Sequence, residues 1–448
     1  MPTATFLQGT KIALEVDRST APSTTSTRTN GPGGPWWAGG GKWFDVVTEG
    51  LPGVQEKQAV IFPKGHAGQR PSNQQVPVVG RKWSEGGLAA PVLSDFLGAL
   101  LLGALGGVST NMIPSTAPSL MAANPVKTNP KSFVLGTQPD AGGNILRFEL
   151  SLQGVAGTVS ISGINSDGFG ASELISFAST GLFYSRTSWS SIGASGIAVS
   201  GMTDGSISIF GIKRFEHLFF TASSAPTFSI ERIATPVAGG PASRSKMHVG
   251  MIMKQLTLNT PADDDAGIFN CSTEFEGDPA ATCTTASNNS TSLLKIWPAW
   301  TLKITRDGGT AWNLAKKFTL NINSANRNYK TAAGTQHPQG KFEGSQEITG
   351  NIDIQLENEV EYNRWQGASV LSAYARWKTD WRLNPTASQN YELGASLNLY
   401  FENLTEAEDE EAFALTGDFR TVVDANWGPG QFILINGTPG TAYGNAVV

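Results

Sequence analysis

The sequence predicts a mainly-β protein, built as a β-sandwich or barrel with one flanking α-helix and a smaller inserted β-sandwich. The 448-residue chain holds 51 Gly and 24 Pro, and only 15% of its residues are charged, against about a quarter in typical domains. This composition suits many short strands joined by polar turns. Alternation of apolar and polar residues with a period of two recurs along the chain, and a single apolar segment stands out as a helix.

The clearest strand lies in the segment "EITGNIDIQLEN". Ile348, Ile352, Ile354 and Leu356 share one face there, and polar residues occupy the other. Such alternation is typical of a half-buried strand. We expect further strands in "KFTLNINS", "ELGASLNLYF", "KIALEV", "AVIFP", "NILRFELSL", "TFSIERI", "KQLTLN" and "QFILIN".

One helix is predicted in "LSDFLGALLLGALGG", residues 93–107. Ser94 and Asp95 beside Pro91 mark its start, and Gly106 and Gly107 supply its end. Its apolar run is shorter than the roughly 20 residues that a membrane span needs. The leucines cover more than one stripe of the helix, so we expect it to lie buried across the open face of the sandwich or barrel.

The acidic segment "TEAEDEEAFAL", residues 405–415, has two interpretations. Its carboxylates would favour the first turn of a second helix, or the segment is a solvated charged turn or loop. The sequence alone leaves both open.

Changes in composition divide the chain into three parts. Residues 1–124 form the first part of the main domain, with an N-terminal arm and a long loop, and residues 225–448 form its second part. Residues 125–224 are rich in Ser and Gly and poor in Lys, which predicts a separate small β-sandwich. Asp167-Gly168 and Asp204-Gly205 are typical hairpin turns within it.

The charge balance argues against tight binding of nucleic acid. The formal net charge is −5, and no run of Lys and Arg is present. A protein that grips DNA needs positive charge to displace counterions from the phosphates. The chain could still enclose DNA without holding it.

No pattern of residues predicts catalysis, a metal site or a cofactor. The four histidines, His66, His217, His248 and His337, are scattered without ligand spacing, so we interpret them as surface or interface residues. Nucleophile elbows, phosphate-binding loops and dinucleotide fingerprints are absent from the sequence. We therefore expect a protein that is not an enzyme.

The two cysteines and the N-terminal sequence indicate the cellular compartment in which the protein folds. Cys271 and Cys283 could form a disulfide within one loop, although free thiols are the preferred interpretation. No basic region followed by an apolar core opens the sequence, so no secretory signal is indicated. Assembly in the cytoplasm is the expectation.

An arm rich in Thr, Ser, Gly and Pro spans residues 17–43 and carries Trp36, Trp37 and Trp43. Indoles on such an arm either fold back on their own domain or dock on a neighbouring copy, because aromatic anchors are enriched at interfaces. A second extended loop covers residues 63–83.

The order of these elements resembles the tail tube proteins of long-tailed bacteriophages. The family's charged-aromatic strand before the helix, which ends in "S-E-G", is matched by Gly80, Trp83, Ser84, Glu85 and Gly86. Its long hairpin is matched by residues 318–323 and 344–356. The similarity covers roughly residues 11–108 and 226–435, while the Ser/Gly-rich stretch resembles the immunoglobulin-like modules of phage virion proteins.

The resemblance implies a structural virion protein of the siphovirus type. Such proteins form hexameric rings that stack into a hollow tail tube, through which double-stranded genomic DNA passes in transit without specific binding. Partners would be further copies of the chain, a tail terminator, a tape measure protein and baseplate or distal tail proteins. We expect assembly in the host bacterial cytoplasm, no membrane contact and no cofactor.

Particular residues are expected at the contacts and in the lumen. Interfaces between subunits are predicted at the arm and the following loop, and two acidic residues are predicted to face the lumen. The interface residues are Trp36, Trp37, Trp43, Phe44, Phe62 and His66, and the lumen residues are Asp353 and Glu357.

A second class of function competes with this one. Twelve Trp could serve as stacking platforms in a carbohydrate-binding or adhesive β-sandwich protein. Glycan binding by a stable monomer would favour that class. An enzyme would instead show a pocket with convergent titratable groups.

Overall fold

The structure is a computed structural model of the whole chain. The residues that it describes are 5–15, 44–46, 53–61, 78–113, 119–126, 130–140, 143–151, 156–165, 170–177, 181–201, 204–212, 214–223, 225–236, 246–261, 267–279, 281–282, 296–307, 309–312, 315–325, 327–329, 340–342, 344–355, 360–382, 390–409, 412–425 and 428–437.

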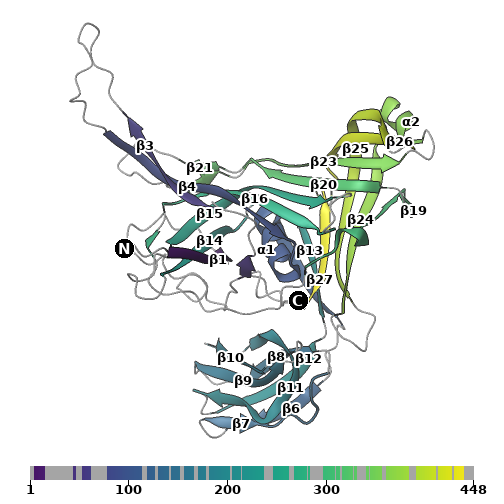
Figure 1. Cartoon of the computed structure of the whole chain (residues 1–448). Helices are drawn as coiled ribbons and strands as arrows, with labels where there is room; N and C mark the ends of the chain where they lie inside the picture. The colour runs from purple at the N-terminus through teal and green to yellow at the C-terminus, as the bar shows by residue number, and fades with distance from the viewer. Residues whose placement is uncertain are drawn as a thin grey trace.

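The fold is mainly β, as the sequence predicts. The described residues form one 18-stranded sheet, one 7-stranded sheet and one 2-stranded hairpin, which Figure 1 shows as a large body with a smaller unit beneath it. The strands of the large sheet are β1 (Thr5–Glu15), β2 (Phe44–Val46), β3 (Gln55–Ile61), β4 (Val78–Pro91), β5 (Gly106–Ile113), β13 (Arg214–Thr221), β14 (Thr227–Pro236), β15 (Lys246–Thr260), β16 (Asn270–Gly277), β17 (Ala281–Thr282), β18 (Lys303–Arg306), β19 (Thr310–Ala311), β20 (Ala315–Ser324), β23 (Gln346–Gln355), β24 (Leu371–Arg382), β25 (Asn390–Asp409), β26 (Ala412–Thr421) and β27 (Gln431–Asn436). The hairpin consists of β21 (Arg327–Tyr329) and β22 (Gly340–Phe342).

Two long strands change partners along their length and so fold the large sheet around a core. The first part of β15 pairs with β14, and its second part lies between β16 and β20. The first half of β25 lies between β24 and β27, whereas its second half pairs with β26. One continuous antiparallel series therefore runs β3–β4–β16–β15–β20–β23–β26–β25.

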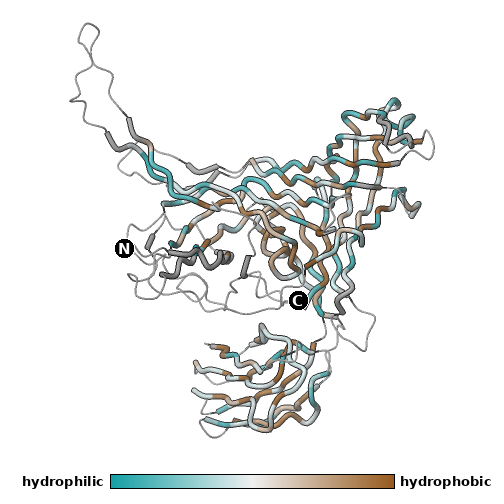
Figure 2. The backbone as a smooth tube through the Cα atoms, in the orientation of Figure 1, coloured by the Kyte–Doolittle hydropathy of each residue, from teal (hydrophilic) through white to brown (hydrophobic). Residues whose placement is uncertain are grey.

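The predicted helix is confirmed as α1 (Ser94–Leu105), and it is buried rather than membrane-spanning. The chain leaves it at Gly106, whose φ of 91° is one that glycine adopts without strain. Figure 2 shows α1 mostly in brown, surrounded by the strands of the body. Its fully buried apolar side chains join the main core: Phe96, Leu97, Ala99, Leu100, Leu101, Leu102, Ala104 and Leu105.

The acidic segment 405–415 is not a helix. β25 continues through Asp409 and β26 begins at Ala412, with Glu406 opposite Leu415, so the segment is a β-hairpin. A short helix that the sequence pattern did not indicate, α2 (Val360–Gln366), lies instead between β23 and β24. Its Glu361 is buried, accepts a hydrogen bond from Trp312 Nε1 (2.9 Å) and pairs with Arg306 (2.8 Å).

The 7-stranded sheet is inserted between two neighbouring strands of the body. The chain leaves at Ile113 of β5 and returns at Arg214 of β13, two residues that face each other across an antiparallel pair. The strands of this inserted module are β6 (Ser119–Pro125), β7 (Lys131–Phe133), β8 (Asn144–Ser151), β9 (Gly157–Asn165), β10 (Gly170–Phe177), β11 (Gly181–Ser200) and β12 (Ser206–Ile212). The boundaries at residues 124/125 and 224/225 remain a prediction, and β6 begins before the first of them.

Of the two hairpin turns predicted in the inserted module, Asp167-Gly168 lies outside the described residues. The strands before and after it, β9 and β10, pair directly, with Ile164 opposite Gly170. Asp204-Gly205 was expected to act in the same way, but it connects β11 to β12, and β8 lies between those two strands in the sheet. The second turn therefore joins strands that are not neighbours.

The inserted module packs against the body through a small apolar cluster, which we call the joint. Ile145, Tyr184 and Ile212 of the module and Phe215 of β13 are all buried there. The rings of Tyr184 and Phe215 meet edge to face with centroids 5.9 Å apart. Met112 of β5 packs against the same cluster. Because both halves contribute buried side chains, the module is held at the body and not merely tethered to it.

Cys271 is a free thiol buried in β16, and burial raises its pKa to about 12. A thiol with that pKa stays protonated and is inert. Cys283 lies outside the described residues. Within the part of the chain that the structure describes, no helix is long and apolar enough to cross a membrane.

Candidate assembly surfaces

Most of the residues predicted at subunit contacts fall outside the described ranges. These are Trp36, Trp37, Trp43, Phe62 and His66, and the predicted lumen residue Glu357 is another. Phe44 belongs to β2, where its backbone pairs with Ile12 of β1. Asp353 belongs to β23 and is partly buried.

Asp353 lies on a broad polar face of the large sheet, which we call the Thr/Asn face. Along β15, β20, β23 and β26 alternate residues point to the core, and the residues between them point outward. More than half of the outward residues are uncharged: Thr257, Asn259, Thr319, Asn321, Thr349, Asn351 and Thr416. The charged ones are Lys317, Glu347, Asp353, Asp418 and Arg420.

Hydrogen bonds between neighbouring strands order this face. The hydroxyl of Thr257 donates to Asn321 Oδ1 over 2.8 Å, and that of Thr319 donates to Asn259 Oδ1 over 2.9 Å. Asn351 Nδ2 donates to Asp418 Oδ1 over 3.0 Å. Cross-strand pairs of this kind stabilise a sheet by a few tenths to about 1 kcal/mol each. The result is a polar surface on which six side chains are hydrogen bonded in pairs across neighbouring strands.

The charges on the Thr/Asn face are few and partly neutralised. Arg420 forms ion pairs with Glu347 (3.2 Å) and Glu402 (2.7 Å). Asp353 stands opposite Lys317 on one side and Thr416 on the other. Its buried Oδ1 has no hydrogen-bond partner among the described residues. Of the two cations that the described residues place on this face, Arg420 is paired with carboxylates, whereas Lys317 forms no ion pair with Asp353. Two cations among these carboxylates make no continuous cationic track.

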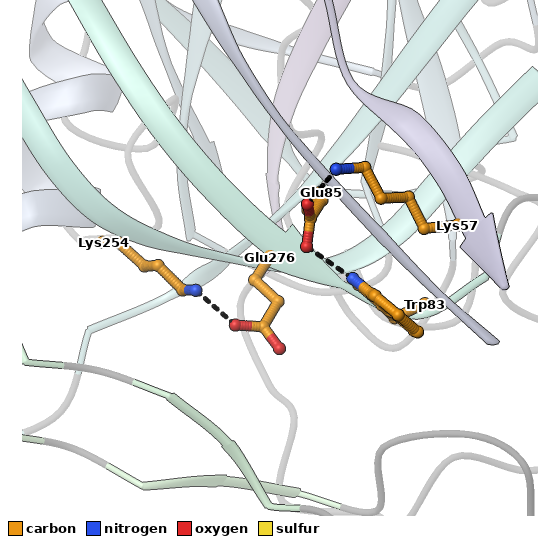
Figure 3. Close-up of polar contacts among 5 residues, drawn as sticks. All are labelled: Lys57, Trp83, Glu85, Lys254 and Glu276. Carbon is orange, nitrogen blue, oxygen red and sulfur yellow. Dashed lines mark hydrogen bonds and ion pairs between the residues drawn. The ribbon is translucent and has the colours of Figure 1, made fainter. Parts of the chain in front are cut away.

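A second polar cluster lies where the β3–β4 hairpin joins the body, and Figure 3 shows it. Glu85 of β4 pairs with Lys57 of β3 and accepts a hydrogen bond from Trp83 Nε1 over 2.6 Å. These two bonds, that from Lys57 first, lower the pKa of Glu85. Beside them Lys254 of β15 pairs with Glu276 of β16. Four strands are therefore joined by charge-assisted contacts at this root.

A buried histidine adjoins the same root. His248 of β15 is fully buried, and its Nδ1 lies 2.8 Å from the hydroxyl of Ser84. Its Nε2 is buried and without a hydrogen-bond partner among the described residues. Burial first, and then the nearby charges of Arg232 and Lys246, lower the pKa of His248 to about 4. The ring is thus neutral near pH 7.

The last residue of the motif at the root allows close contact between backbones. Gly86 has a φ of 147°, and a Cβ there would lie 2.8 Å from the carbonyl oxygen of Gly53 and 2.9 Å from Val54 Cα. Only glycine fits this position without displacement. Ser84 therefore fixes a contact between the β3–β4 hairpin and β15, whereas Glu85 and Gly86 fix contacts between the two sides of the hairpin itself.

The expectation of surface or interface histidines is wrong for two of the four. His217 and His248 are both fully buried. His217 Nε2 lies 3.0 Å from Asn436 Oδ1, and its Nδ1 lies 2.9 Å from the hydroxyl of Thr110. Sequence reasoning missed them because an isolated histidine in an alternating strand carries no sign of its partners. His66 and His337 lie outside the described residues.

The sequence matches the family model of the phage tail tube protein over residues 68–426, which is most of the chain. That range contains the motif strand, α1, the inserted module and the Thr/Asn face. The chain belongs to the phage tail tube protein family. A comparison with curated proteins gives no match.

Membership in this family makes the chain a structural component of a phage tail, and the family is not one of enzymes. A tail tube protein acts by assembly with further tail proteins, as part of the virion. Its functional surfaces are then those that meet other copies and those that line the tube. Among the described residues no group of three or more His, Cys, Asp or Glu could hold a metal ion.

Proposed function

We propose that this tail tube protein forms hexameric rings that stack into the hollow tube of a siphovirus-type tail and deliver double-stranded DNA through it. The Thr/Asn face is the observation that carries the proposal. It is broad, its strands are linked by side-chain hydrogen bonds, and among its described residues carboxylates outnumber the two cations, Lys317 and Arg420. In the proposed tube this face, with Asp353 and Glu357, lines the lumen.

Such a lining suits passage of DNA on physical grounds. Each lysine or arginine that contacts a phosphate releases a counterion and adds affinity, so a cationic wall would hold the duplex. A wall of Thr and Asn on which carboxylates outnumber cations offers little such gain. A net charge of −5 per subunit, repeated around a ring, also disfavours adhesion.

The contacts between copies follow the sequence predictions. We assign the arm at Trp36, Trp37, Trp43 and Phe44, together with the loop at Phe62 and His66, to contacts between rings. Residues 125–224 form an immunoglobulin-like domain on the outside of the tube. A tail terminator, a tape measure protein and baseplate or distal tail proteins are the remaining partners, and assembly takes place in the host cytoplasm.

Electron microscopy of the purified full-length chain tests the assembly. Stacked rings with an open centre are expected, and image averages should show six-fold symmetry. Monodisperse single molecules at high concentration would contradict the proposal. If such molecules bound glycans, the carbohydrate-binding alternative would replace it.

Added charge tests the lining separately. Thr416→Lys with Asp418→Lys places two cations on exposed positions next to Asp353. Phage particles that carry this double variant should assemble and release DNA more slowly at low salt, with recovery at high salt. The matched control is Thr416→Ser with Asp418→Asn, which adds no cation. Unchanged release at low salt would remove the Thr/Asn face from the lumen.

A further inference from the structure

One tryptophan side chain of the body is exposed to solvent on a turn whose backbone is hydrogen bonded. Trp300 belongs to η2 (Ala299–Thr301), a single turn of 3₁₀ helix, and 70% of it is exposed. Its neighbours on both sides, Ala299 and Thr301, are buried. Large aromatic side chains usually bury most of their surface, so this exposure leaves apolar area available for a partner.

The backbone around Trp300 is fixed by hydrogen bonds on both sides. Ala299 N donates to Gly267 O over 2.5 Å, and Leu302 N donates to Ala299 O over 3.1 Å. The hydroxyl of Thr301 donates to Pro298 O over 2.9 Å. The indole is therefore held in place before any contact forms, which lowers the entropy lost on binding.

The second feature is an apolar patch on β13 and β27. Leu218 and Phe220 of β13 and Ile433 and Ile435 of β27 are each partly exposed, and they alternate with buried neighbours. Leu218 stands directly opposite Ile433. We call these four residues the outer apolar patch. Gly107 of β5 leaves room for the ring of Phe220, since a Cβ there would lie 2.5 Å from it.

The patch and Trp300 lie toward opposite margins of one sheet. The strands between them are ordered β5–β13–β27–β25–β24–β18. The patch covers β13 and β27, next to the margin at β5. Trp300 precedes β18 and its turn contacts β24. Figure 1 shows β13 and β27 beside α1, and β24 with β19 farther out.

Opposite margins of one subunit meet when copies associate head to tail. In such a contact a surface of one copy meets a different surface of the next, and repetition closes a ring when the rotation between copies allows it. A head-to-tail contact needs two different complementary surfaces. This subunit has an apolar anchor toward one margin and an apolar patch toward the other. A contact between like surfaces would use only one of them.

We propose that Trp300 of one copy docks on the outer apolar patch of the next copy and anchors the head-to-tail contact within the ring. The inference rests on the proposed function, since it assigns partners for the ring. Indole on aliphatic and aromatic side chains is the chemistry of interface anchors, and one such anchor often dominates the affinity. The contact requires no charge, so it should persist at high salt.

Trp300→Ala in the full chain is the first test. Because the indole is exposed, the variant should fold and melt as the wild type does. The concentration needed for ring or tube formation should rise roughly tenfold or more, as for loss of an interface anchor. Leu174→Ala, which removes a side chain 60% exposed in the inserted module, is the matched control and should assemble normally.

A mixture of two defective variants tests the head-to-tail geometry. The Trp300→Ala variant keeps the outer apolar patch but lacks the indole. The Leu218→Glu variant keeps the indole but has a charge within the patch. Alone, each should stay monomeric near the wild-type assembly concentration. Mixed, they can form one intact contact per pair, so sedimentation should show one-to-one dimers that do not grow.

The outcomes separate this inference from the proposed function. Tubes of Trp300→Ala at the wild-type concentration would overturn the anchor and leave the tube intact. Absence of dimers from the mixture would overturn the patch as its receptor. A wild-type chain that remains monomeric under all conditions would overturn both proposals.

Discussion

Two antiparallel strand pairs extend from the body of this protein. The regions where they join the body, which we call their roots, are built differently. The β5–β13 hairpin carries the inserted module, and its root is apolar, with Phe215 and Tyr184 at the joint. The β3–β4 hairpin extends from the other side of the body (Figure 1). Its root is made of ion pairs around Glu85 and Glu276 and of the buried pair Ser84 and His248.

The two roots also differ in how their buried histidines are hydrogen bonded. Asn436 Nδ2 donates to Ser94 O over 3.2 Å, so its Oδ1 faces His217 and can only accept. His217 Nε2 therefore donates to Asn436 Oδ1, and Nδ1 lies within hydrogen-bonding distance of the Thr110 hydroxyl. Both nitrogens are satisfied, whereas among the described residues His248 has a partner for one of its two nitrogens. At equal burial, one root thus holds a fully hydrogen-bonded histidine, and the other holds a histidine that resists protonation while the chain is folded.

The largest effect is expected at the apolar root. Phe215→Ala removes a fully buried ring and should lower the free energy of unfolding by about 3–5 kcal/mol, because a cavity replaces the packed side chain. Phe210→Ala, which truncates a partly buried member of the same cluster, should cost less. Chemical denaturation measures both. Equal losses would mean that the joint is loosely packed.

Acid should act on the β3–β4 root. The pKa of His248 is about 4 in the folded chain and near 6.5 when unfolded, so the unfolded state binds the extra proton between these values. Stability is complete above pH 6.5 and falls as pH drops through 4, by about 3 kcal/mol in total. Carboxylates remain ionised down to about pH 5, so between that value and pH 6.5 the four histidines are the side chains that titrate, and a variant must separate His248 from the others.

Hydrogen exchange and a variant check the origin of the acid effect. Between pH 6.5 and 5 the amides of β4 and β15 should lose protection before those of β13 and β27. His248→Asn keeps a hydrogen-bonding group for Ser84 and cannot titrate, so its stability should stay flat over that range. The same slope in this variant would assign the effect to other groups.

A third prediction concerns the close approach at the β3–β4 root. Gly86→Ala forces a side chain into a φ of 147° against the backbone of Gly53 and should cost about 1–3 kcal/mol. Gly170→Ala in β10 is the control, because a Cβ there meets nothing within 4 Å. Thermal melts of the two variants should differ clearly, and similar melting temperatures would refute the close packing.

The smallest effect is expected for the exposed ion pair. Lys57 and Glu85 side chains are 51% and 36% exposed, so Glu85→Gln should change the free energy of unfolding by less than about 1 kcal/mol. Glu276→Gln should cost more, because Glu276 is only 7% exposed and its loss leaves Lys254 without that partner. The reverse order in urea titrations would contradict this ranking.

Periodicity sufficed for most of the fold. Strands such as β20, β23 and β27 follow directly from alternation, because half-buried strands need an apolar residue at every second position. The helix α1 followed from its length, its leucines and the glycines at Gly106 and Gly107. These features are local, and neighbouring residues decide them.

Elements that depend on distant partners escaped prediction. The segment 405–415 has the composition of a helix start, yet pairing of β25 with β26 overrides it. The helix α2 has only seven residues, and its buried Glu361 is stabilised by Arg306 and Trp312, which lie far from it in the sequence. Local propensity is weak against such tertiary contacts.

Composition and short-range periodicity are enough to predict the mainly-β class, the buried helix, the family motif and the absence of a cationic stripe, because each of these is a local property of the chain. Three features depend on the folded arrangement: which polar residues share the Thr/Asn face, that His248 Nε2 has no partner among the described residues, and that Trp300 and the outer apolar patch lie toward opposite margins of one sheet. Those relations join residues hundreds of positions apart, and only the pairing of strands brings them into register.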